Sequence, residues 1–439
     1  MLLKMTKGTV PFVIFRQDRG RFSDKTGGRF SVLSARTRQR TVPLSCRDAA
    51  AVLAAAILLT GCTGAAGSGA AGSSAGAGKA AEVTQSAAPA EAQPAALSES
   101  DKLSREIFAM DTYMTLTAYG PEAERALSAA VDEIGRLDAL LSTGSEDSEI
   151  SRLNARSGSS PAADSDSNAA QAETVSAAAG DTAAFTLSTD SAALMKESLA
   201  LYRDTAGAFD VTIYPMMKLW GFTSGEYRVP SDDEIRETLS LVGSDAIAFD
   251  EASRAVTFSK EGTEIDFGGI AKGYTSGRIM EVFRENGVKS GIVSLGGNVH
   301  ALGLKPDGSR WNVAIRSPEN DGSFLGIVEA EDEAVITSGG YERYFESDGQ
   351  TYHHILDPET GRPAESGLKS VTIVCGDGTQ ADGLSTALFV MGEEKAFAFW
   401  RAHKDTFDCI LLTEDDRLLA SGGLRETFSS EHKIEWIDS

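Results

Sequence analysis

Hydrophobic residues recur along the chain at two spacings, one typical of helices and the other typical of strands. From Pro121 to Leu141 they return every three or four positions, which predicts an amphipathic helix that starts at the proline. Alternation of apolar and polar residues within Ile107–Tyr119 predicts a strand instead. The helical spacing returns four more times, and we expect helices at Ser191–Thr205, Ser231–Leu241, Ala271–Asn286 and Ala381–Met391.

Short apolar runs between turn residues predict further strands in the second half of the chain. They are Ala246–Asp250, Ala255–Ser259, Thr263–Phe267, Gly291–Leu295, Trp311–Arg316, Phe324–Ala330, Tyr341–Glu346, Tyr352–Leu356, Lys369–Cys375 and Cys409–Thr413. Helices therefore concentrate early and in the middle, while strands dominate later. This order favours an α+β fold over a regular alternation of strands and helices.

The N-terminal segment has the features of an export signal. An apolar run, Ala49–Leu59, follows several arginines, and small residues lead directly to Cys62. The run is too short to span a bilayer as a helix. The tetrapeptide 59–62 resembles a bacterial lipobox, which predicts that Cys62 receives lipid and anchors the protein outside the cytoplasm; a chance cysteine is the alternative. Roughly 40 residues precede the signal, more than it needs, so we expect translation to start downstream, at Val32 or Val42 for example.

Composition divides the chain into three parts. Residues 1–61 form the extension and signal peptide, and residues 62–103 are rich in Ala, Gly and Ser and predict a flexible tether. Residues 104–439 form the ordered domain. Within that domain, residues 157–182 have low complexity, and we interpret them as a disordered surface insertion.

The net charge of the domain excludes some classes of binding partner. The net charge is −23 although residues 1–61 are basic, so the domain is strongly acidic. An acidic domain argues against nucleic acid as a partner and against electrostatic attachment to anionic lipid.

Cys375 and Cys409 lie in apolar runs, where buried thiols are expected, although spacing alone leaves a disulfide open.

One candidate cation site lies in the predicted helix Ala381–Met391. Asp382, Ser385 and Thr386 stand at positions i, i+3 and i+4, so their side chains share one helix face. Three oxygen-bearing groups, one of them anionic, suit a hard cation such as Mg²⁺. Asp382 as an ordinary N-cap is the alternative.

A second candidate segment runs from Glu264 to Tyr274. A predicted strand leads into the pair Gly268-Gly269 and then into a helix with Lys272 in its first turn. Glycines allow close approach of a ligand, and a helix N-terminus with a lysine can hold phosphate. A tight turn between strand and helix is the plain alternative.

Two further segments carry polar residues at strand ends. Ser294–Asn298 contains a second glycine pair, and Tyr352–Pro358 contains two of the five histidines, His353 and His354. Adjacent residues on a strand point to opposite faces, so one histidine at most faces a given site. The spacing argues against zinc and is compatible with a single histidine base.

Taken in order, these segments resemble the successive signatures of one family, the ApbE family, whose members are FAD:protein FMN transferases formerly called thiamine biosynthesis lipoproteins. The resemblance covers roughly Ser104 to Thr413. It rests on Met110–Thr112, Ala208–Asp210 with Leu219–Phe222, Asp266–Tyr274, Ser294–Asn298, His354–Pro358 and Ala381–Thr386. It implies an ApbE-like single catalytic domain of mixed sheets and helices.

The resemblance also implies roles for individual residues. FAD would be contacted by Met110, Ala208, Phe209, Asp210, Asp266, Lys272 and Ile355. Mg²⁺ would be held by Asp382, Ser385, Thr386 and the backbone carbonyl of Gly269, and His354 would be the general base. One departure concerns Ser142-Thr143-Gly144, where many members have an aromatic residue after the Ser-Thr pair that could stack on the flavin or adenine.

The implied reaction is Mg²⁺-dependent transfer of FMN from FAD to a Thr or Ser hydroxyl of an exported acceptor, with release of AMP. Such acceptors belong to extracytoplasmic electron-transport systems. This chain lacks the family's target pattern Asp-x-x-[Ser/Thr]-Gly-Ala-[Ser/Thr], which favours modification of another protein. Two alternatives remain open, a Mg²⁺-dependent FAD pyrophosphatase and a non-enzymatic FAD-binding lipoprotein.

Overall fold

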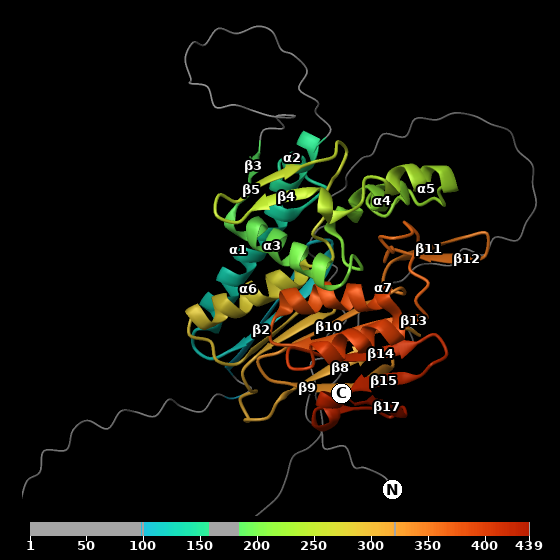
Figure 1. Ribbon diagram of the computed structural model, residues 1–439. Coiled ribbons are helices and arrows are strands. Elements are labelled where there is room, and N and C mark those ends of the chain that lie inside the picture. Colours follow the sequence, from blue (N-terminus) through green and yellow to red (C-terminus); the bar gives the residue numbers. More distant parts are fainter. Residues whose placement is uncertain (1–97, 99–100, 158–183, 320–321, 439) are drawn as a thin grey trace, which may run out of the picture. The chain divides into compact units, whose positions relative to one another are not determined.

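A large mixed sheet carries most of the elements that build the site (Figure 1). The computed structural model describes residue 98 and residues 101–157, 184–319 and 322–438. The predicted signal peptide, Cys62, nearly all of the predicted tether and residues 158–182 of the predicted insertion lie outside these ranges. The first strand begins at Lys102, two residues before the expected start of the domain.

Nine strands form the large sheet, and all neighbours are antiparallel except the last pair. In spatial order they are β1 (Lys102–Ala109), β2 (Thr112–Tyr119), β6 (Gly291–Leu295), β7 (Asn298–Leu302), β10 (Ala334–Gly339), β13 (Leu368–Cys375), β14 (Asp408–Thr413), β15 (Leu418–Ser421) and β17 (Ile434–Ile437).

Three smaller sheets and seven helices complete the described part of the chain. The sheets are β16 (Phe428–Ser429), β9 (Phe324–Ala330) and β8 (Trp311–Arg316); β3 (Phe185–Thr186), β5 (Ala255–Phe258) and β4 (Ile247–Asp250); and the hairpin β11 (Tyr344–Ser347) with β12 (Gln350–His353). The helices are α1 (Ala123–Leu141), α2 (Glu149–Ser157), α3 (Thr189–Asp204), α4 (Tyr214–Leu219), α5 (Asp232–Leu239), α6 (Ala271–Glu285) and α7 (Gly378–Ala402), with 3₁₀ turns η2 (Val211–Ile213), η3 (Ser244–Ala246) and η4 (Gly422–Glu426).

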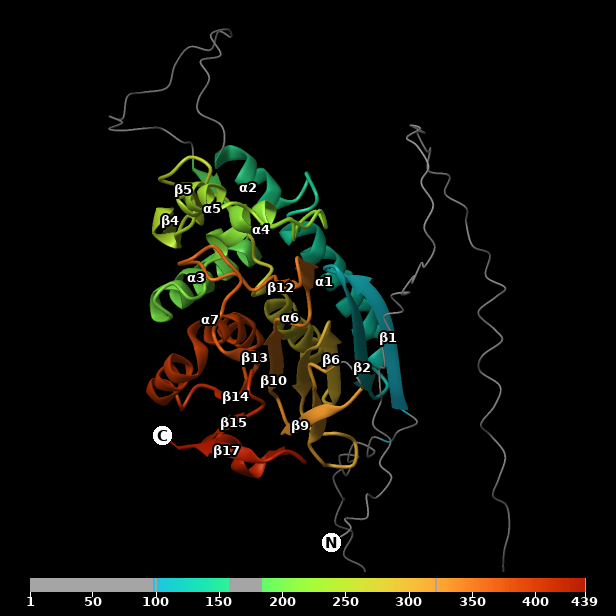
Figure 2. The same cartoon turned by 90° about the vertical axis from the view of Figure 1, so that its right-hand side faces the viewer.

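The alternation of side chains along the central strands places a hydrophobic core on each face of the large sheet. On β14, Cys409 and Leu411 join the core that contains residues of α3 and α7, whereas Ile410 and Leu412 join the core that contains β8 and β9. Figure 1 shows α6 and α7 above β10 and β14, with β9 below them, and Figure 2, turned by 90°, shows β1 and β2 along one side. The mixture of antiparallel sheets and helices confirms the α+β prediction.

Most predicted helices and strands are present, but two predicted strands are wrong. Ile107–Tyr119 is a hairpin rather than one strand, because Met110 and Asp111 have φ of +48° and +61° and turn the chain between β1 and β2. Thr263–Phe267 is not a strand. There the side-chain amide of Asn154 donates to the carbonyl of Ile265 (2.8 Å) and accepts from its N–H (2.9 Å), as a neighbouring strand would.

Helix α7 starts earlier and ends later than predicted. It begins at Gly378, and the carboxylate of Asp377 accepts from the N–H groups of Thr379 and Gln380. Asp377 is therefore the N-cap, and the capping alternative for Asp382 is wrong. Gly392 has φ of +76°, which interrupts the helix. Asp382 lies in the second turn, free to serve another purpose.

Two further sequence expectations can be checked in the described residues. Cys375 and Cys409 are buried free thiols, as predicted, and burial raises the pKa of Cys375 to about 12. Within the described ranges, none of the helices combines the length and the apolar character that crossing a bilayer requires.

Candidate functional site

The site is assembled where the N-terminal turns of α6 and α7 cross. A Cβ at Gly273 would collide with the carbonyl of Gly378, and one at Gly378 would lie too close to the carbonyl of Gly273. Only glycine at both positions permits this approach. The close packing of the two helices brings Lys272 of α6 beside Asp382 of α7.

The carboxylate of Asp382 is the anionic centre of the site. The side chain is buried, with 3% of its surface exposed. Its Oδ2 accepts from the N–H of Gly273 (2.8 Å), its Oδ1 accepts from Nδ2 of Asn298 (2.9 Å), and Nζ of Lys272 lies 3.9 Å from Oδ1. These contacts hold a buried charge in one orientation.

Two hydroxyls lie on the same helix as Asp382, as the spacing predicted. Ser385 Oγ donates to the backbone carbonyl of Asp382 (2.8 Å). Ser338, on β10, contacts both predicted cation ligands: its Oγ lies 2.7 Å from Ser385 Oγ and 3.3 Å from Thr386 Oγ1. A carboxylate and three hydroxyls therefore share one small region.

The glycine loop before α6 faces these hydroxyls. A Cβ added at Gly269 would lie 3.9 Å from Thr386 Oγ1 and 3.3 Å from the ring of Phe209. The backbone of Gly269 therefore lies close to the hydroxyl of Thr386. All the donor atoms are oxygen, which fits Mg²⁺.

The candidate cation site has only one carboxylate. Among the residues that the structure describes, no group of three or more His, Cys, Asp and Glu side chains could hold a metal ion. Mg²⁺ is commonly bound by one or two carboxylates together with substrate phosphates and water. The residues present therefore fit a cation that shares its coordination with a phosphate-bearing ligand.

Two further carboxyl groups, those of Asp266 and Glu342, lie near Lys272 and have raised pKa values. Burial raises the pKa of Asp266, although the N–H of Gly268 donates to it (2.9 Å) and Lys272 and Arg343 oppose the shift. Burial also raises the pKa of Glu342 to about 7, against the charges of Lys272 and Arg316. Asp266 is half-buried and Glu342 is exposed. Carboxyl groups with shifted pKa values beside a lysine are typical of functional sites.

The two adjacent histidines have different surroundings. Nε2 of His353 lies 3.2 Å from the carbonyl of Ala364, and its ring meets Phe389 edge-on, inside the protein. Nδ1 of His354 lies 3.1 Å from the carbonyl of Arg343. Because a carbonyl only accepts, Nδ1 of His354 carries the proton and Nε2 has a free lone pair.

The environment of His354 keeps its ring neutral. Burial lowers the pKa of His354 to about 3; the carbonyl of Arg343 works in the opposite direction, and the charges of Arg343 and Lys272 lower it further. The side chain is nevertheless partly exposed. It can accept a proton through Nε2, and the approach of an anionic ligand would strengthen it as a base.

The remaining predicted FAD contacts take three kinds of position. Met110, in the β1–β2 turn, has its Sδ 3.6 Å from Thr275 Oγ1 of α6. Ile355 and Phe209 are buried apolar residues beside the site, and Ala208 packs against the same core. Asp210 is different, because its carboxylate accepts four bonds, from the N–H and hydroxyl groups of Thr212 and Ser244. It shapes the loop that presents Phe209.

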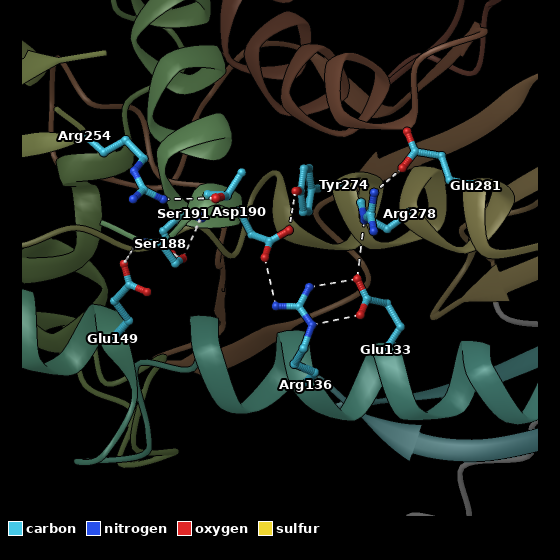
Figure 3. A network of polar contacts seen from close by, with 11 residues as sticks. Glu133, Arg136, Glu149, Ser188, Asp190, Ser191, Arg254, Tyr274, Arg278 and Glu281 are labelled. Carbon is cyan, nitrogen blue, oxygen red and sulfur yellow. Dashed lines mark hydrogen bonds and ion pairs between the residues drawn. The ribbon is translucent and has the colours of Figure 1, made fainter. Parts of the chain in front are cut away.

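A polar network behind the site fixes α6 to α1 and α3 (Figure 3). Asp190 of α3 accepts from the Tyr274 hydroxyl (2.7 Å) and from Arg136 of α1 (2.8 Å). Arg136 also forms two 2.8 Å bonds to Glu133, which accepts in addition from Arg278 of α6. We call Glu133, Arg136, Asp190, Tyr274 and Arg278 the helix clamp. It holds α6, and with it Lys272, in place.

Sequence reasoning gave no role to three residues of the site. Asn298 was part of a quoted motif, and the turn at Gly296-Gly297 now explains how it reaches Asp382. Ser338 and Glu342 had no signal, because β10 was not predicted and the loop after it was assigned to a strand. The site becomes complete only when separate elements meet.

Comparison with known proteins shows the family of the chain. Residues 110–411 match the profile of the ApbE family. The FAD:protein FMN transferase of Treponema pallidum (strain Nichols) is 31% identical over 73% of this chain and 87% of that protein. The FAD:protein FMN transferase of Vibrio cholerae serotype O1 is 34% identical over 67% of this chain and 79% of that protein.

Solved structures of ApbE proteins have a similar fold. The ApbE protein of Thermotoga maritima superposes with a TM-score of 0.64 at 30% identity, covering 73% of this chain and 97% of that one. The flavin transferase ApbE from Vibrio cholerae gives a TM-score of 0.63 at 28% identity, covering 74% and 99%.

Proposed function

The chain belongs to the ApbE family and is an FAD:protein FMN transferase, and we propose that it works with Mg²⁺ held at Asp382, Ser385, Thr386 and the carbonyl of Gly269. The observation that carries the cation assignment is the single buried carboxylate of Asp382 among oxygen donors, beside Lys272. A site with one carboxylate suits a cation that also binds phosphate oxygens. Mg²⁺ there would neutralise charge on the pyrophosphate of FAD.

The residues around the cation site would bind FAD and orient it. Lys272 and the N-terminal turn of α6 offer positive charge to the pyrophosphate. Met110, Ala208, Phe209 and Ile355 supply apolar surface for the flavin or adenine. Asp266 and Lys272 supply polar contacts, and Asp210 braces the loop of Phe209.

The proposed chemical step is a phosphoryl transfer. A Thr or Ser hydroxyl oxygen of the acceptor attacks the FMN-side phosphorus of FAD and forms a phosphoester bond. The bond from that phosphorus to the bridging oxygen breaks, and AMP leaves with the electron pair. Nε2 of His354 takes the hydroxyl proton, because Nδ1 is occupied by the carbonyl of Arg343.

A direct experiment incubates the full chain with FAD, Mg²⁺ and a test protein that carries the target pattern. Fluorescence in a denaturing gel reports covalent flavin, and chromatography reports AMP and free FMN. We expect a fluorescent acceptor and AMP, both lost on addition of EDTA. FMN and AMP without labelled acceptor would indicate a pyrophosphatase, and intact FAD would indicate a binding protein.

We also propose that the protein is exported and lipid-anchored through Cys62, and that its acceptor is an exported subunit of an electron-transport system. The support is the apolar run before Cys62 and the Ala/Gly/Ser-rich stretch after it. Expression of Cys62→Ser beside the unaltered chain in a bacterial host tests the anchor. The variant should move from the membrane fraction to the soluble one, and equal membrane retention of both would contradict the proposal.

A further inference from the structure

Ser338 lies on the sheet opposite the cation-binding face of α7. Its strand, β10, alternates: Ala334 and Ile336 belong to the core that contains α7, and Ser338 continues that face. Thr337, between them, points to the other side, where its hydroxyl lies 2.8 Å from that of Thr372. Ser338 is thus the residue of β10 that reaches the two predicted hydroxyl ligands.

One hydrogen bond, to the backbone carbonyl of Asp382, determines which hydroxyl donates in each of the other contacts. Ser385 donates its only hydroxyl proton to the carbonyl of Asp382 (2.8 Å), and a carbonyl can only accept. In the 2.7 Å contact between Ser338 and Ser385, Ser338 must therefore be the donor. With its own proton used, Ser338 accepts in its 3.3 Å contact with Thr386. The hydroxyls form a directed relay from Thr386 through Ser338 and Ser385 to the backbone of Asp382.

This direction decides what the two ligand oxygens present to a cation. Every proton of the relay points into the protein, so Thr386 Oγ1 keeps both lone pairs and Ser385 Oγ keeps one. A cation needs lone pairs and is repelled by hydroxyl protons. Without an acceptor at position 338, Thr386 would turn its proton elsewhere, for example to the carbonyl one helical turn before it.

We propose that Ser338 is a positioning residue of the cation site, because its hydroxyl accepts the proton of Thr386 and donates its own proton to Ser385, which leaves the protons of both ligands directed away from the bound Mg²⁺. The proposal rests on the proposed function, since it assumes that Mg²⁺ binds at Asp382, Ser385 and Thr386. Ser338 acts through the ligands and touches neither FAD nor the acceptor. Loss of such a supporting contact typically weakens metal binding about 10–100-fold.

The test measures FAD binding by flavin fluorescence across a Mg²⁺ titration, without acceptor, in the full chain. Ser338→Ala removes the relay, and Ser338→Thr keeps a hydroxyl. Thr337→Val is the matched control, because it removes a bonded hydroxyl from the same strand on its other face. Thermal unfolding of each variant verifies that it is folded.

We expect Ser338→Ala to need about 10-fold or more Mg²⁺ for half-maximal binding. Ser338→Thr should return most of that shift, and Thr337→Val should titrate like the unaltered chain. A folded Ser338→Ala that titrates like the unaltered chain would overturn the role of Ser338 alone, as would a Ser338→Thr that is folded and equally impaired. FAD binding that ignores Mg²⁺ in the unaltered chain would overturn the cation site itself, and the role of Ser338 with it.

Discussion

Helix α6 takes part in two polar clusters that differ in how completely their charges are partnered. Tyr274 and Arg278 belong to the helix clamp, where both oxygens of Asp190 and both oxygens of Glu133 accept bonds. Two residues earlier, Lys272 belongs to the site, where Asp266 accepts one hydrogen bond, from the N–H of Gly268, and the carboxylate of Glu342 accepts none from the described residues. The carboxylates of the helix clamp are fully hydrogen-bonded within the protein, whereas those of Asp266 and Glu342 are not.

The pKa shifts run in opposite directions in the two clusters. In the clamp, hydrogen bonds from Arg136 lower the pKa of Glu133, and for Asp190 the bonds from Arg136 and Tyr274 outweigh the effect of burial, so its pKa is also lowered. In the site, burial dominates and raises the pKa of Asp266 and Glu342. Desolvated groups that lack partners are typical of sites whose partners arrive with the ligand.

The largest expected effect comes from breaking the site at its anionic centre. Asp382→Ala removes the only carboxylate of the proposed cation site, and we expect transfer to fall at least about 10³-fold. The assay is covalent flavin on the acceptor at saturating FAD. Transfer within about 10-fold of the unaltered chain would contradict the assignment.

Replacing His354, the proposed general base, should slow the transfer reaction and leave FAD binding nearly unchanged. His354→Ala should slow transfer about 10²–10⁴-fold while the Kd for FAD changes little, because in the proposed mechanism Nε2 acts on the acceptor hydroxyl. His353→Gln is the control, since that side chain faces the carbonyl of Ala364 and should leave the rate nearly unchanged. An equal loss of FAD affinity in His354→Ala would argue for a binding role instead.

Breaking the clamp should cost stability. Arg136→Ala leaves Glu133 and Asp190, both mostly buried, without their main partner, and we expect about 1–3 kcal/mol of destabilisation in denaturant unfolding. Arg125→Ala, which removes an exposed ion pair on the same helix, should stay within about 0.5 kcal/mol. If the two variants unfold alike, the clamp contributes no more than a surface pair.

The smallest effect concerns the pH dependence of stability. Glu342 has a folded pKa of about 7 against 4.5 for an ordinary glutamate, so the folded state holds its proton longer and stability falls as pH rises through that window. Glu342→Gln should make the fall shallower between about pH 4.5 and 7. Thermal unfolding across this range checks it, with the exposed Glu106→Gln as control. Parallel profiles would contradict the shift.

Contiguous motifs made much of the site predictable. Asp382, Ser385 and Thr386 could be grouped because helical spacing alone places them on one face. Gly268–Lys272 could be expected at a helix start for a similar local reason. Ser338, Asn298 and Glu342 could not be grouped with them, because their proximity depends on the pairing of β7 with β10 and of β10 with β13.

The fold shows the same division between local and distant information. Helices such as α3 and α6 were predicted almost to the residue, because their spacing is a local pattern. The β1–β2 turn was missed because Met110-Asp111 contains no glycine or asparagine to mark it. The strand predicted at Thr263–Phe267 failed because the partner of Ile265 is the side chain of Asn154, distant in the sequence.

The contrast between the two clusters is tested most directly by thermal unfolding with FAD, with Mg²⁺ and with both, in the unaltered chain, Asp382→Ala and Arg136→Ala. A ligand that binds only the folded state raises Tm. We predict that FAD and Mg²⁺ together raise Tm by more than the sum of their separate effects in the unaltered chain and in Arg136→Ala, but not in Asp382→Ala. The same synergy in Asp382→Ala, or its loss in Arg136→Ala, would contradict the account.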